Sequence, residues 1–255
     1  MIKHYLSLIK FSHTIFAMPF AMIGFALAVL KPGLSLGRDE IIMKFILVVL
    51  CMVFARSAAM AFNRYLDRSF DALNPRTAIR EIPAGIIRAN NALLFTLVNA
   101  LLFVVACWFI NPLCFYLSFV ALFVILFYSF TKRFTALCHM VLGLGLSLAP
   151  IGAYLAVTAR FDVLPVLFSA TVLCWVSGFD IIYALQDEEF DRGHKLHSIP
   201  AAMGKSNALM LSRILHLLSA SAAITAGLYA GFCLWYRTGM MVFSGMLIYQ
   251  QSIVR

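Results

Sequence analysis

The sequence predicts an all-α fold: a polytopic membrane helical bundle with eight transmembrane helices. Of the 255 residues, 63% are hydrophobic and only 12% are charged, and the mean hydropathy is +0.93. Soluble domains carry about a quarter charged residues, so this composition excludes an ordinary soluble protein. Apolar stretches close to the roughly 20 residues needed to cross a bilayer recur along the whole chain.

The apolar stretches define the eight expected spans. The first follows Lys3 and Lys10 as a signal peptide would, but it contains Pro19 and runs into Lys31 without a small-residue cleavage site, which favours a retained helix. Short turns separate the fourth span from the third and the sixth from the fifth, and the last span is the shortest. The spans cover residues 14–30, 41–62, 92–110, 113–130, 136–157, 163–185, 208–231 and 239–253.

The positive charge sorts to one side of the membrane. The net charge is +9, which in a soluble protein would raise the question of nucleic acid binding; here we expect no nucleic-acid partner. With a cytoplasmic N-terminus, most of the 20 Lys and Arg residues fall in cytoplasmic segments, including the long loops 64–91 and 186–207. The positive-inside rule predicts this orientation, and we expect an integral protein of the bacterial inner membrane.

The cysteines and the loops bear on domain organisation. The six cysteines are scattered through apolar spans without a CxxC pair, which favours reduced, buried thiols over a disulfide framework or a zinc site. No linker or low-complexity segment divides the chain. We therefore expect residues 1–255 to form a single transmembrane domain.

Carboxylates are concentrated in two clusters, each at the cytoplasmic end of a span. An ionisable group costs about 2.5 to 3.5 kcal/mol at the centre of a membrane helix, and acids within or beside spans are rare without a partner, so this placement points to function. The clusters are Asn63, Asp67 and Asp71 in NRYLDRSFD, and Asp180, Asp187 and Asp191 in DIIYALQDEEFD.

The spacing within the clusters predicts a magnesium site. Residues four apart lie on one face of a helix, so the first cluster forms one stripe and the last two residues of the second form another. Facing carboxylates in a poorly hydrated cavity require a cation, and oxygen ligands suit Mg²⁺, which shares its coordination sphere with substrate phosphates. The predicted ligands are Asn63, Asp67, Asp71, Asp187 and Asp191.

Cations surround these acids in the sequence. Arg76 and Arg80 follow the first cluster in NPRTAIREIPAG, and Lys132 and Arg133 lie directly at the end of a span. Arginine can hold pyrophosphate oxygens with two hydrogen bonds, so these four residues are candidates for binding a pyrophosphate. His194, Lys195 and His197 could also contribute, although cytoplasmic cations are expected in any membrane protein.

Arg56 lies inside an apolar span, two turns before Asn63 on the same face. A lone intramembrane arginine requires an anion. The anion is either Asp180, in a structural ion pair, or the carboxylate of a substrate, which would leave Asp180 and Tyr183 to contact a phenol or polarise its ring. His13, His139 and His216 have no partner at helical spacing, and we interpret them as structural.

Both motifs resemble those of the UbiA superfamily of intramembrane aromatic prenyltransferases. NRYLDRSFD is followed by NPRT and IPAG, FDIIYALQDEEFD forms the second motif, and the similarity runs in register from the first span to the eighth. The chain is most similar to 4-hydroxybenzoate polyprenyltransferases and to relatives proposed for menaquinone synthesis through the futalosine route. REIPAGIIRANNAL and EEFDRGHKLHSIPAAMG favour the latter group.

The resemblance implies a Mg²⁺-dependent transfer of a polyprenyl group from a polyprenyl diphosphate to an aromatic carboxylic acid, either 4-hydroxybenzoate or a hydroxynaphthoate, in quinone biosynthesis. Lys132 and Arg133 would assist the diphosphate, and Arg56 would lie near the acceptor. The implied catalytic residues are Asp67, Asp71, Asp187, Asp191, Asp180 and Tyr183.

Two departures from the family pattern affect these expectations. Glu188 stands where the family often has a basic residue, so that contact is either missing or supplied by Arg192. The family normally has nine helices, and we expect the last to be missing here.

Other interpretations stay open. The acids could be solvated loop residues in surface ion pairs with Arg64, Arg68 and Arg192. A cation-coupled membrane transporter would also place acids and an arginine within spans, although its acids usually lie near the bilayer midplane. An inactive scaffold retained for partner binding is a third possibility.

Overall fold

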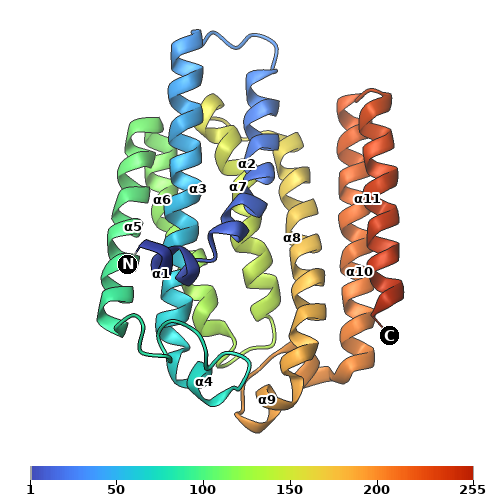
Figure 1. Cartoon of the computed structure of the whole chain (residues 1–255). Helices are drawn as coiled ribbons and strands as arrows, with labels where there is room; N and C mark the ends of the chain where they lie inside the picture. The colour runs from blue at the N-terminus through green and yellow to red at the C-terminus, as the bar shows by residue number, and fades with distance from the viewer. Residues whose placement is uncertain (1, 255) are drawn as a thin grey trace. The chain divides into compact units, whose positions relative to one another are not determined.

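The computed structural model describes residues 2–254, except for the side chains of residue 2 and of residues 11–16, and this described part contains helices but no strands (Figure 1). His13 and Arg255 lie outside the described side chains. The predicted all-α fold is confirmed.

Each of the eight expected spans corresponds to a long helix. These are α2 (Phe11–Val29), α3 (Arg38–Leu66), α5 (Ala89–Ile110), α6 (Pro112–Thr131), α7 (Cys138–Thr158), α8 (Val163–Ala184), α10 (Ile199–Ala230) and α11 (Leu234–Ile253). Short elements lie between or before them: α1 (Ile2–Leu8), α4 (Arg68–Leu73), the 3-10 helix η1 (Leu185–Asp187) and α9 (Glu188–Gly193).

Six segments of the described chain are long and apolar enough to cross a membrane: α3, α5, α6, α7, the stretch Val163–Gly193 and α10. The described part of α2 adds a shorter apolar helix, Ala17–Val29. The chain is therefore an integral membrane protein.

Helix α10 begins nine residues before the expected span because hydropathy marks only the part that lies in lipid, whereas backbone hydrogen bonding continues beyond it. Its polar first turns bend at Gly204, where φ is +78°, a conformation that glycine adopts without steric cost. Ser198 caps the helix by accepting a hydrogen bond from the Ala201 amide. The bend therefore separates the short first part of α10 from the long apolar helix.

The chain divides into two compact units. The first consists of Met1–Phe130 and Gly152–Arg160, and the second of Thr131–Ile151 and Phe161–Arg255. Each unit carries one of the two acidic clusters.

In the first unit, α3 packs mainly along α5 and also against α2. A cluster of Leu8, Ala61, Ile87 and Ala92 attaches α1 and the loop after α4 to the end of α3 that carries the acids. Further along α3, Lys44 Nζ donates to the carbonyl oxygens of Ile110 at 3.2 Å and Ala156 at 3.0 Å. Its ammonium group thus meets helix ends, where the dipole favours a cation.

In the second unit, α8 and α10 form the most extensive helix pair. Their backbones approach closely, since Ser212 Oγ donates to the Gly178 carbonyl at 2.8 Å and Ser219 Oγ donates to the Thr171 carbonyl at 2.8 Å. Small and hydroxyl side chains commonly allow membrane helices to pack this tightly.

Gly178→Ala should destabilise this helix pair. A methyl group at this position would lie 2.6 Å from His216 Cδ2 and 3.2 Å from the Ser212 carbonyl oxygen, and such overpacking typically costs about 1 to 3 kcal/mol. We expect a lower melting temperature in detergent. Gly152→Ala is the matched control, because its added methyl group would meet nothing within 4 Å. Equal melting temperatures for the two variants would contradict the tight packing.

Candidate active site

The first acidic cluster keeps helical spacing across the end of α3. The Asp67 amide donates to the Asn63 carbonyl at 2.9 Å, and the Asp71 amide donates to the Asp67 carbonyl at 2.8 Å. The hydrogen-bonding pattern therefore continues from α3 into α4, although Asp67 itself is no longer helical in ψ. The Asn63 side-chain amide donates to Asp67 Oδ2 at 3.1 Å, which places these two side chains together. The predicted stripe is present.

Asp71 is a buried carboxylate held between two arginines. Its side chain is 8% exposed, and Oδ1 accepts a hydrogen bond from Arg80 Nη1 at 2.6 Å. Arg64 Nη1 lies 3.9 Å from Oδ2, too far for a hydrogen bond. Within residues 2–254, Oδ2 has no hydrogen-bond partner. A buried carboxylate oxygen in this condition is suited to accept a metal ion or a donor from a ligand.

The NPRT segment places Arg80 against Asp71. The buried Thr77 hydroxyl donates to the Asp71 carbonyl at 3.0 Å, and Asn74 Oδ1 accepts from the Arg76 amide at 3.0 Å, as in an Asx turn. The turn that results carries Arg80 back to the carboxylate. The Arg76 side chain is exposed.

Arg64 was expected only as a possible surface partner of the acids, but it is buried. Its side chain is 4% exposed, and Nε and Nη1 donate no hydrogen bond in the described part of the chain. A buried guanidinium with unused donors is costly unless an anion approaches it. Its position directly after Asn63 in the motif was the available signal.

Arg56 lies on α3, seven residues before Asn63, as expected. Its side chain is half-buried, and Nε is buried with no hydrogen-bond partner among the described residues. This nitrogen is available to an anionic ligand.

In the second unit, Asp191 is fully buried on α9. Its Oδ1 lies 2.7 Å from Lys132 Nζ, whereas Oδ2 has no hydrogen-bond partner in the described chain. The Lys132 carbonyl also accepts a hydrogen bond from the His197 amide at 2.7 Å. The loop after α6 and the segment after α9 are therefore joined at both the side chain and the backbone of Lys132.

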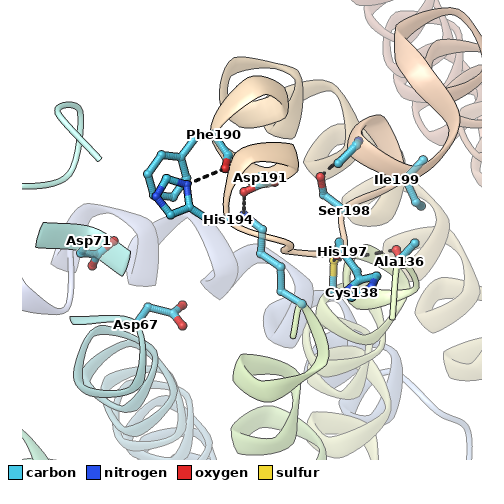
Figure 2. A network of polar contacts seen from close by, with 12 residues as sticks. Asp67, Asp71, Ala136, Cys138, Phe190, Asp191, His194, His197, Ser198 and Ile199 are labelled. Carbon is cyan, nitrogen blue, oxygen red and sulfur yellow. Dashed lines mark hydrogen bonds and ion pairs between the residues drawn. The ribbon is translucent and has the colours of Figure 1, made fainter. Parts of the chain in front are cut away.

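Figure 2 shows Asp191 on the same short turn as Phe190 and His194, whose Nδ1 lies 2.9 Å from the Phe190 carbonyl oxygen. Asp187 ends η1, one turn before Asp191, and is half-buried. Arg133, His194, Lys195 and His197 are exposed.

Asp180 and Tyr183 lie on the last turns of α8. The sequence left open a structural ion pair between Asp180 and Arg56; the partner of Asp180 within its own unit is His139, with Nδ1 at 2.7 Å from Oδ2. His139 was expected to have no partner at helical spacing, and its partner indeed lies on a different helix. Spacing along one helix could not have revealed the pair, because its members lie on α7 and α8. Tyr183 is 42% exposed.

The alternative of solvated surface pairs is wrong for Asp71 and Asp191, because both are buried. Arg68 instead donates to the Tyr65 carbonyl and lies over the Tyr65 ring at 4.5 Å from its centroid. Arg192 forms an ion pair with Glu188 at 3.0 Å, and its Nε donates a hydrogen bond to the Ala201 carbonyl oxygen at 3.2 Å.

The described residues contain no group of three His, Cys, Asp or Glu side chains that is already arranged to hold a metal. Mg²⁺ nevertheless fits the donors that are present. It usually takes only one or two carboxylates from the protein and completes its shell with water and phosphate oxygens. Asp71 Oδ2 and Asp191 Oδ2, two buried oxygens without a hydrogen-bond partner among the described residues, are such donors.

The fold and these clusters define a class of protein: a helical integral membrane protein whose motifs at helix ends combine buried carboxylates with arginine and lysine. Residues 17–255 match the sequence model of the UbiA prenyltransferase family, and the chain belongs to that family. Family membership favours an enzyme over the transporter and scaffold interpretations.

Relatives and solved structures agree with this assignment. The chain is 34% identical over 200 residues to a 4-hydroxybenzoate octaprenyltransferase of Tolumonas auensis, covering 78% of this chain and 70% of the relative. It is 30% identical to the enzyme of the same name from Shewanella halifaxensis, covering 82% and 73%. A UbiA homologue from Aeropyrum pernix superposes with a TM-score of 0.85 at 30% identity, covering 95% of this chain and 88% of that one.

A UbiA homologue from Archaeoglobus fulgidus, solved with GPP and Mg²⁺, superposes with a TM-score of 0.78 at 20% identity, covering 98% and 86%. At this identity the likeness shows the shared fold.

Proposed function

We propose that this protein transfers a polyprenyl group from a polyprenyl diphosphate to an aromatic carboxylic acid of the 4-hydroxybenzoate type, in a Mg²⁺-dependent step of quinone biosynthesis. The observation that carries the proposal is that two buried carboxylates, Asp71 beside Arg80 and Asp191 beside Lys132, each have an oxygen without a hydrogen-bond partner in the described chain. The names of the curated relatives support the aromatic acid as acceptor. A hydroxynaphthoate acceptor in menaquinone synthesis is the alternative within the same reaction class.

We further propose that residues 1–255 act as one prenyltransferase domain in a bacterial inner membrane, with both clusters facing the cytoplasm. The excess of Lys and Arg in the loops that carry the clusters supports this orientation.

The proposed ligands of the diphosphate and its metal follow from each cluster separately. In the first unit they are Asn63, Asp67 and Asp71, and in the second they are Asp187 and Asp191. When bound, Mg²⁺ would neutralise negative charge on the diphosphate. The Archaeoglobus homologue of the same fold was solved with ligands of this kind, GPP and Mg²⁺.

In the reaction, the bond between prenyl C1 and the diphosphate oxygen breaks, and its electron pair leaves with the oxygen. A ring carbon of the acceptor forms the new bond to C1, and the ring loses a proton. Arg80 and Lys132 would donate hydrogen bonds to the departing diphosphate, where negative charge develops, and Arg76 and Arg133 would add positive charge nearby. The apolar surroundings exclude water, which would otherwise capture the prenyl cation.

Arg56, Asp180 and Tyr183 are the residues that we assign to binding of the acceptor. The unused Nε donor of Arg56 would bind the carboxylate of the acceptor. Asp180 and Tyr183 would contact its hydroxyl group.

The direct test is prenyl transfer by the purified protein in lipid, with a polyprenyl diphosphate and Mg²⁺, offering 4-hydroxybenzoate and 1,4-dihydroxy-6-naphthoate in parallel. We expect prenylated product from one acceptor, its loss on chelation with EDTA, and recovery on adding Mg²⁺. Product from the naphthoate alone would select the menaquinone branch. Absence of product from both acceptors, in a sample that retains its melting transition, would reject the proposed function.

A further inference from the structure

His139 joins two segments of the second unit through its two ring nitrogens. It is 3% exposed and lies at the start of α7. Nδ1 lies 2.7 Å from Asp180 Oδ2 on α8, and Nε2 accepts a hydrogen bond from the Ile199 amide, at the start of α10, at 3.2 Å. One buried ring therefore contacts two helices other than its own.

The contact with Ile199 determines which nitrogen carries the proton. A backbone amide can only donate, so Nε2 must be the unprotonated nitrogen of the ring. The ring proton then resides on Nδ1, which donates to the Asp180 carboxylate. Nδ1–H of His139 therefore donates to Asp180, and the contact between Nε2 and the Ile199 amide fixes the orientation of the ring.

Only one oxygen of Asp180 is used in this way. The Asp180 side chain is 28% exposed, whereas that of His139 is 4% exposed. Among the described residues, Oδ2 is the oxygen of Asp180 for which a hydrogen bond is seen. A carboxylate in an apolar helix that is held at one oxygen and whose side chain is partly exposed has the arrangement expected of a group that binds a hydrogen-bond donor from a ligand.

Cys138, the residue before His139, also contacts the segment that follows Asp191. Cys138 Sγ lies 3.5 Å from the His197 carbonyl oxygen, which it approaches as a weak donor (Figure 2). The His197 amide donates to the Lys132 carbonyl oxygen. The Lys132 side chain in turn pairs with Asp191. A change at His139 can therefore act in two ways: on the orientation of Asp180, or on the docking of the 194–199 segment.

We propose that His139 is a positioning residue for the acceptor: it fixes Asp180 so that Oδ1 accepts the hydrogen bond of the acceptor's ring hydroxyl. This inference rests on the proposed function. It assigns to His139 an orienting role in acceptor selection, exerted through Asp180 without direct contact with the reacting atoms.

Two substitutions separate the two contacts of the ring. In His139→Asn, the side-chain amide nitrogen occupies roughly the place of Nδ1 and can donate to Asp180, but the side chain does not reach Ile199. In His139→Gln, the carbonyl oxygen occupies roughly the place of Nε2 and can accept from the Ile199 amide, but Asp180 loses its donor. The pair therefore distinguishes positioning of Asp180 from anchoring of α10.

Kinetics in lipid, with the acceptor that the wild type uses, provide the test. We expect His139→Gln to keep its melting temperature and lose about 10- to 100-fold in kcat/KM for the acceptor, with the KM of the prenyl diphosphate unchanged. His139→Asn should retain most of this activity while its melting temperature falls. The reverse pattern, or losses in both variants that follow the melting temperature alone, would overturn the inference.

A binding measurement covers the case in which a variant is too unstable for kinetics. The wild type should bind its acceptor more tightly than the O-methyl ether of that acceptor, because the ether cannot donate to Asp180 Oδ1. In His139→Gln this preference should disappear; an unchanged preference would overturn the inference. His216→Gln, a second buried histidine of the same unit, should keep it. If the wild type prenylates neither acceptor, the proposed function is rejected. The results for the His139 variants bear only on the role of His139.

Discussion

Asp191→Asn is expected to lower kcat/KM for prenyl transfer by about 100- to 1000-fold, the range seen when one preorganised electrostatic contact is removed from an active site. The substitution keeps the size of the side chain but removes the charge that Lys132 Nζ meets at 2.7 Å and that Oδ2 would offer to a metal. The measurement is steady-state prenyl transfer in lipid nanodiscs as a function of Mg²⁺ concentration. A higher Mg²⁺ requirement should accompany the loss.

Glu188→Gln is the matched control for this prediction. It removes an acidic charge from the same short helix, but its partner Arg192 is 57% exposed, and exposed ion pairs contribute only about 0.2 to 1 kcal/mol. We expect near wild-type kinetics. Full activity in Asp191→Asn, with a normal melting temperature, would contradict the assignment of the second cluster to the diphosphate.

Arg56→Ala should raise the KM of the acceptor by about 10- to 100-fold, because a charge-assisted hydrogen bond is worth about 1.5 to 3 kcal/mol. The KM of the polyprenyl diphosphate should change little. The physical reason is that Arg56 Nε is a buried donor without a partner in the described chain, two turns of helix from the first cluster. Initial rates measured over a grid of both substrate concentrations distinguish the two effects.

An analogue sharpens the test of Arg56. In the wild type, replacing the acceptor carboxylate by a carboxamide should weaken binding, and in Arg56→Ala the acid and the amide should bind equally. Arg56→Lys retains the charge without the planar donor geometry and should give an intermediate KM. A rise in the KM of the diphosphate, with acid and amide still discriminated, would show that Arg56 acts on the donor side.

The helices and the two acidic clusters at helix ends were predictable because they depend on local patterns. An apolar run of about 20 residues specifies a membrane helix wherever it occurs, since lipid leaves the backbone no other hydrogen-bond partners. The spacing of Asn63, Asp67 and Asp71 likewise needed only a continuing helix, and backbone hydrogen bonds carry that pattern past Leu66. The family resemblance was carried by these same local motifs.

Burial and pairing were not predictable from the same patterns. The sequence left open whether Asp71 and Asp191 are solvated, and their burial depends on how the NPRT turn and the loop after α6 fold back over them. Arg64 was interpreted as a possible surface cation, yet its side chain lies almost wholly inside the first unit.

The pair formed by His139 and Asp180 shows most clearly what the sequence predicts and what only helix packing decides. Each residue could be placed on its helix from hydropathy and spacing, because both depend on neighbours within a few turns. Their contact depends on the packing of α7 against α8 and on the start of α10, segments up to 60 residues apart. Residue types and periodicity thus suffice for the helices and for the placement of the charged residues along them, whereas the partner of each buried charge is determined only when the helices pack.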